Sequence, residues 1–187
     1  MEFRRRVHFL GALAFVSASL LTAAPARARV LLSQKDALGL AFPEGTKVER
    51  RTAFLTDVQA ADAEKAAGVK IDSKVWTYYV GTSSSGAAGT AYFESHKVRT
   101  MNEAFMVVVN PDATVRFIEI LSFAEPNEYL APKKWLGQFE RRPLDGDLML
   151  RRGLRNITGA SITSEAVTRG VRRVLAVHRV LNSGPAK

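Results

Sequence analysis

Four hydroxyl side chains gather at the start of a predicted helix near the C-terminus. The segment RNITGASITSEAV covers residues 155–167, and its hydroxyls belong to Thr158, Ser161, Thr163 and Ser164. One hydroxyl is enough to cap a helix, so capping by Ser161, Thr163 or Ser164 leaves the others without a role. The free amides of a helix N-terminus also bind anions such as phosphate, and an exposed hydroxyl there could form a phosphoester. The segment therefore predicts either an elaborate helix start or a phosphate site.

The amino-acid composition narrows the chemistry that the chain can perform. Its 187 residues include no cysteine and three scattered histidines. This composition excludes thiolate metal sites, iron–sulfur clusters and cysteine nucleophiles, and it argues against a protein-built metal centre. Redox chemistry in this chain would need an organic cofactor. The hydrophobic content of 47% and the charged content of 24% are typical of a folded globular protein.

The N-terminus has the pattern of a bacterial export signal. Arg4, Arg5 and Arg6 precede an apolar run over residues 7–24, and a small-x-small cleavage site follows over residues 26–28. We therefore expect a signal peptide over residues 1–28, with an uncleaved membrane anchor as the alternative, and one domain over residues 29–187. The expected location is extracytoplasmic, in the periplasm or at the membrane.

The charge of the chain points to a membrane surface or a protein partner. Cleavage of the signal leaves 23 basic and 17 acidic residues. Outside the cytoplasm, such a basic surface favours anionic lipid headgroups or an acidic protein over nucleic acid, although it can also serve solubility alone.

The remaining patterns predict an α+β fold with a mainly antiparallel sheet and packed helices. Helices are expected over 33–43, 56–68, 144–155 and 164–181, with broken helical turns over 125–139. Strands are expected over 75–80, 89–98, 103–109 and 114–123. On the last helix, an apolar stripe includes His178, while Arg169, Arg172, Arg173 and Arg179 fall mostly outside it.

Other residues have both a functional and a structural interpretation. The Gly/Ser-rich loop over 81–89 lacks a phosphate-binding lysine and is expected to be a hairpin loop. His96 could donate to a cofactor or be an ordinary strand residue, and His178 is expected to be a satisfied core or interface histidine. A set of aromatic residues could pack a flavin ring or the sheet core: Trp76, Tyr78, Tyr79, Tyr92 and Phe93.

The segment TGASITSEAV resembles the flavinylation motif of the FMN-binding domain family. That family includes the flavin-carrying subunits of sodium-pumping NADH:quinone reductases and Rnf-type complexes, and NosR-type domains. The resemblance implies an FMN site formed by Thr158, Gly159, Ala160, Ser161, Ile162 and Thr163. It further implies that Ser161 receives FMN through a phosphoester made by a flavin transferase of the ApbE type. Arg155 stands where the family motif has an acidic residue, so noncovalent FMN stays open.

These observations together favour an exported electron carrier. The resemblance implies a flavoprotein that relays electrons between a membrane donor and a redox acceptor, with no catalytic residues of its own. Two alternatives stay open: a non-redox envelope binding or regulatory module, and a flavin-dependent reductase with its own substrate.

Overall fold

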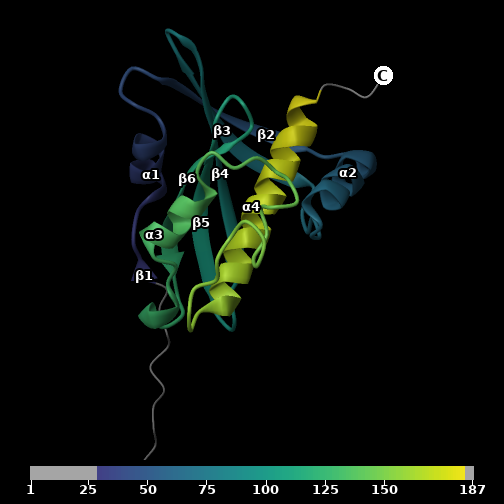
Figure 1. The fold of residues 1–187 in the computed structure, drawn as a ribbon. Helices are drawn as coiled ribbons and strands as arrows, with labels where there is room; N and C mark the ends of the chain where they lie inside the picture. The colour runs from purple at the N-terminus through teal and green to yellow at the C-terminus, as the bar shows by residue number, and fades with distance from the viewer. Residues whose placement is uncertain (1–28, 184–187) are drawn as a thin grey trace, which may run out of the picture.

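The computed structural model describes residues 29–183, so the expected export signal over residues 1–28 lies outside the described part of the chain. Antiparallel strands form one sheet in the order β1-β6-β5-β4-β3-β2 (Figure 1). They are β1 (Arg29–Val30), β2 (Lys47–Phe54), β3 (Val75–Ser83), β4 (Gly86–Lys97), β5 (Asn102–Val109) and β6 (Val115–Phe123). From β2 to β6, each strand pairs with the next one along the chain. This meander confirms the predicted α+β fold with a mainly antiparallel sheet.

Helices cover both faces of the sheet. They are α1 (Gln34–Ala41), α2 (Asp57–Ala67), α3 (Lys133–Leu136) and α4 (Ser161–Asn182), with 3-10 turns η1 (Asn127–Tyr129) and η2 (Gly137–Phe139). The long α4 crosses one face and packs on α2, β4 and β5, while α1 lies on the other face (Figure 1). Successive residues of a strand point to opposite faces of the sheet. On β5, Val107 therefore packs in the core between the sheet and α4 (the α4 core), and Val108 packs in the core between the sheet and α1 (the α1 core). Among residues 29–183, no helix combines the length and apolarity needed to cross a membrane.

Local signals placed the first two helices correctly. The Ser33 hydroxyl accepts a hydrogen bond from the Asp36 amide and caps α1. Thr56 and Gln59 form a capping box at the start of α2, and Gly68 ends this helix with a left-handed φ of 66°. The Gly/Ser-rich loop forms the hairpin between β3 and β4, as predicted.

The sequence patterns missed two strands and predicted one helix wrongly. The missed strands are β1 and the edge strand β2, whose residues are mostly exposed and half of which are charged. The helix predicted over 144–155 is instead a series of turns, in which the Asp145 carboxylate accepts hydrogen bonds from the amides of Asp147 and Leu148. Such side-chain acceptors compete with helical hydrogen bonding.

Gly170 brings α4 close to the sheet. A Cβ added at this position would lie 2.7 Å from Cζ of Phe105 on β5 and 3.2 Å from Cγ of Glu94 on β4. The absence of a side chain therefore lets the helix backbone approach both strands. His178, further along α4, is the satisfied core histidine that the sequence predicted, because it is buried and its Nδ1 lies 3.0 Å from the Tyr92 hydroxyl.

Candidate functional site

A glycine turn leads directly into α4. Gly159 has a φ of +82°, which a side chain would strain, although space for a Cβ is free. Ala160 is buried and is the residue that precedes the first helical residue, Ser161. The helix therefore begins three residues earlier than the predicted start at Ser164.

The predicted capping by Ser161, Thr163 or Ser164 was wrong. The residue at the capping position is Ala160, which has no side-chain acceptor, because the earlier helix start places all three hydroxyls within the first turn. The Ser164 hydroxyl instead accepts from the Ile157 amide at 2.9 Å and donates to the Ala160 carbonyl at 3.0 Å. Ser164 thus fixes the turn, and the buried Thr163 belongs to the interior.

Ser161 is the hydroxyl that this arrangement leaves accessible. Its side chain is exposed and takes part in none of the side-chain hydrogen bonds formed among residues 29–183. Because Ala160 provides no cap, the first-turn amides of α4 have no side-chain acceptor either. Free amides at the positive end of a long helix suit a phosphate group.

Most of the predicted site residues line one small cavity. Gly159, Ala160, Ser161, Ile162 and Thr163 border a space of about 150 Å³, the motif cavity. Thr158 is exposed on the turn and lies outside this lining. The opposite wall of the motif cavity consists of Val98, Arg99, Glu125 and Tyr129.

A larger cavity of about 590 Å³ reaches Ser161 from the side of α2. We call it the Arg172 cavity; its lining includes Val69, Met149, Arg151, Ser161, Arg169 and Arg172. Its three arginines outnumber its one carboxylate, Glu165, whose Oε1 lies 3.8 Å from Arg169, so this side of Ser161 has a net positive charge. Guanidinium groups pair well with phosphate oxygens, so the residues around Ser161 suit a phosphate ester.

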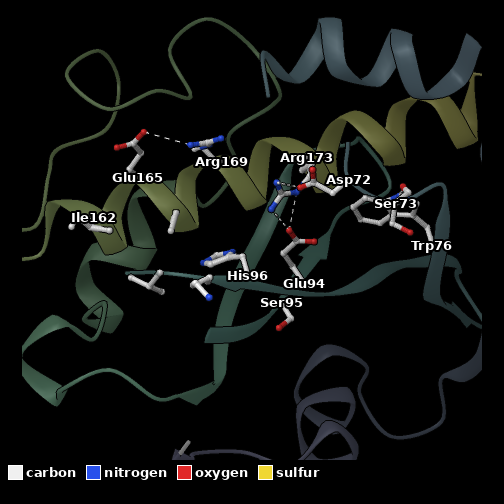
Figure 2. Close-up of a pocket in the computed structure, with 13 residues that line it drawn as sticks. Asp72, Ser73, Trp76, Glu94, Ser95, His96, Ile162, Glu165, Arg169 and Arg173 are labelled. Carbon is white, nitrogen blue, oxygen red and sulfur yellow. Dashed lines mark hydrogen bonds and ion pairs between the residues drawn. The ribbon is translucent and has the colours of Figure 1, made fainter. Parts of the chain in front are cut away.

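A third cavity, the β4–α4 groove, measures about 510 Å³ (Figure 2). Its lining includes Trp76, Glu94, His96, Ile162, Ala166 and Arg173. It shares Ile162 with the motif cavity and Arg169 with the Arg172 cavity, so all three surround the first turns of α4. Its volume falls in the range of small-molecule and cofactor sites, about 300–1,000 Å³.

An ion pair and a buried histidine–glutamate hydrogen bond lie along the groove. Arg173 donates to the Glu94 carboxylate through Nε at 2.8 Å and through Nη2, and its Nη1 lies 3.7 Å from Asp72 (Figure 2). Burial raises the pKa of Glu94, although Arg173 opposes this shift. His96 Nε2 lies 3.0 Å from the carboxylate of Glu103, which is fully buried.

The sequence patterns missed Glu94, Glu103 and Arg173 as site residues. Their signal was weak, because Glu94 meets Arg173 only when α4 packs on β4, and Glu103 meets His96 only through the register of β4 and β5. His96 and Trp76 were named as potential cofactor contacts and do line the groove. The other aromatic residues divide between the faces, since Tyr92 packs in the α4 core whereas Tyr79 and Phe93 pack against α1.

Arg155 is fixed by its backbone and leaves its side chain exposed. Its carbonyl accepts a hydrogen bond from Trp135 Nε1 at 2.5 Å, and its amide donates to Gln138 Oε1 at 2.9 Å. Both contacts use only main-chain atoms of Arg155, so an acidic residue at position 155 would be compatible with the same turn.

We expect Glu125, in the wall of the motif cavity, to make stability depend on pH. Its carboxylate accepts hydrogen bonds from the amides of Thr100 at 2.6 Å and Met101 at 2.8 Å, and these bonds lower the pKa of Glu125 below its usual value of 4.5. The carboxylate therefore stabilises the fold fully above the usual pKa, and this contribution is lost as pH falls through the lowered pKa of the folded state. In urea unfolding, the stability advantage over Glu125→Gln should be constant near about pH 7 and shrink toward about pH 3. An advantage that does not change with pH would contradict this role.

Comparison with known families identifies the class of protein. Residues 102–176 match the model of the FMN-binding domain, a region that runs from β5 through most of α4 and includes the whole motif. This match confirms the resemblance to the FMN-binding domain family over that region and supports an FMN-binding flavoprotein with FMN as its cofactor. No curated protein matches the chain.

Proposed function

We propose that this flavoprotein is exported, carries FMN covalently on the Ser161 hydroxyl, and relays electrons at the outer side of the cytoplasmic membrane. The observation that carries the proposal is the accessible Ser161 hydroxyl, which directly follows Gly159 and Ala160 at an uncapped helix start. This hydroxyl lies within an FMN-binding domain.

The surroundings of Ser161 suit a phosphoester. In the attachment step, the seryl oxygen forms the new bond to phosphorus and loses its proton, while the flavin donor of the transferase loses the group that it carried on that phosphorus. The amides of the first turn and the arginines at positions 151 and 169 would then neutralise the remaining phosphate charge. The site residues are thus Thr158, Gly159 and Ala160 in the turn, Ser161 as the acceptor, and Ile162 and Thr163 in the first helical turn.

A covalent bond is valuable for a protein outside the cytoplasm. Retention of the flavin then does not depend on affinity or on the dilute surroundings. Attachment through the phosphate leaves the ring available, and FMN supplies one- and two-electron chemistry when bound. A chain without cysteine has no thiolate-held redox centre, so the flavin would be the relay between a membrane donor and an acceptor.

Intact-mass measurement tests both the attachment and the processing. We expect protein coexpressed with a flavin transferase to begin after residue 28 and to carry the mass of one FMN less one water. The denatured band should fluoresce on a gel under ultraviolet light. A bare polypeptide mass together with a dark band would contradict covalent attachment, and a full-length mass would favour an anchor over a cleaved signal.

A further inference from the structure

We propose that the β4–α4 groove holds the isoalloxazine ring of FMN, and that the Arg172 cavity does not. This inference builds on the proposed attachment to Ser161. It names the ring-binding residues as Trp76, Glu94, His96, Ile162, Ala166 and Arg173.

The groove starts beside the attachment point and follows the helix. Ile162 borders both the motif cavity and the groove, so the two spaces meet next to Ser161. From there Ala166, Arg169 and Arg173 continue the groove wall at helical spacing. With a rise of 1.5 Å per residue, the wall from Ile162 to Arg173 extends about 16 Å, which leaves room for a ribityl chain and a ring in sequence.

The walls of the groove match the two kinds of surface that a flavin ring presents. Trp76, Ile162 and Ala166 are apolar and suit the ring faces. Arg173, which pairs with the carboxylates of Glu94 and Asp72 in the same lining, suits the carbonyl-bearing edge (Figure 2). Ile162 is 49% exposed although it is large and apolar. A bound ring would cover this side chain.

Unsatisfied polar atoms concentrate beneath the same groove. Among the described residues, the buried side-chain atoms without a hydrogen-bond partner are His96 Nδ1 and Glu103 Oε1, which belong to one hydrogen-bonded pair. Such unpaired buried atoms are rare in native proteins. The His96 side chain lines the groove, and its Nδ1 lies under α4, where a Cβ on Gly170 would be 3.4 Å away. Both imidazole nitrogens thus face the protein, so His96 forms part of the groove floor and Glu103 holds its imidazole in place.

The Arg172 cavity is less suited to a ring. Its lining contains no aromatic side chain, and Arg172 already donates to the carbonyls of Ala67, Asp145 and Leu148. The remaining guanidinium donors in this cavity belong to Arg151 and Arg169, and they suit a phosphate group. The two spaces therefore differ in chemistry, with cations near the ester and a mixed apolar and polar groove beyond it.

Filling each cavity in turn tests the assignment. Ala166 lines the groove and Val69 lines the Arg172 cavity, so Ala166→Phe and Val69→Phe form a matched pair. In protein loaded by the transferase, we expect Ala166→Phe to keep the covalent mass but to expose the ring, so that iodide quenches flavin fluorescence severalfold more strongly. Val69→Phe should quench like the unmodified chain. The opposite pattern, or equal effects, would overturn the assignment.

Two further measurements keep the test decisive. Ile162→Ala, at a half-exposed position, should also increase iodide quenching if Ala166→Phe fails to fold, and unchanged quenching in it would count against the groove. If no covalent flavin forms, FMN added to the apoprotein should bind about tenfold more weakly to Ala166→Phe and unchanged to Val69→Phe. That result would support the groove as the ring site and contradict the ester on Ser161, so the two proposals can be told apart.

Discussion

Ser161→Ala is expected to abolish covalent flavin while the fold persists. The substitution removes the accessible hydroxyl of the motif and touches no hydrogen bond within residues 29–183, because the turn is fixed by Ser164 and not by Ser161. Alanine is also a good helix former, so α4 should retain its first turn. After coexpression with the transferase, the intact mass should be that of the bare polypeptide and the denatured band should be dark under ultraviolet light.

Two neighbouring variants control this result. Thr158→Ser keeps a hydroxyl at the exposed turn position three residues before Ser161 and should leave covalent loading intact. Ser161→Thr keeps the acceptor oxygen, so loading should persist. Fluorescence that survives in Ser161→Ala would assign the acceptor elsewhere.

Local sequence signals predicted the parts of the fold that depend on few residues. The caps at Ser33 and Thr56, the hairpin turns and the turn at Gly159 all act over a few positions, and the structure has each of them at the expected place. The helix start after Gly159 was predicted three residues too late. The edge strand β2 was not predicted because its sequence shows no alternation of apolar and polar residues. This strand forms by pairing with β3.

The candidate site was predictable at the motif and not in the groove. Gly159, Ala160 and Ser161 are contiguous, so a motif can encode them. By contrast, Glu94 meets Arg173 and His96 meets Glu103 through strand register and the close approach of α4 at Gly170. Glu94 and Arg173 lie far apart in the chain, whereas His96 and Glu103 are near each other but meet only across β4 and β5. Neither contact is apparent before the sheet and α4 are assembled.

The burial of Arg172 was not predictable from the helix pattern either. The pattern placed this residue mostly outside the apolar stripe, but its side chain is buried. Its Nε donates to the Ala67 carbonyl at 2.6 Å, and its Nη1 donates to the carbonyls of Asp145 at 2.7 Å and Leu148 at 3.1 Å. The guanidinium thus joins the C-terminal end of α2 and the irregular segment before the motif to α4. Positive charge also suits the C-terminal end of a helix dipole. Burial lowers the pKa of Arg172.

Arg172→Met should therefore be the most destabilising of the substitutions considered for the apoprotein. It keeps the apolar length of the side chain but leaves three carbonyls without their donors, for which we expect a loss of about 3 kcal/mol in the free energy of unfolding. For a chain of this size, that loss corresponds to a decrease in Tm of about 6–12 °C. Urea unfolding followed by far-ultraviolet circular dichroism measures it directly.

Arg169→Met is the matched control on the same helix. Arg169 is exposed, and its guanidinium lies 3.8 Å from the exposed Glu165, so its removal should cost no more than about 0.5 kcal/mol. Arg172→Lys should give an intermediate loss, because an ammonium retains the charge but cannot reproduce the fork of donors. Equal losses for Arg169→Met and Arg172→Met would mean that the three carbonyl contacts do not stabilise the fold. The loop before the motif would then have to be fixed by other contacts, such as those of the Arg155 backbone with Trp135 and Gln138.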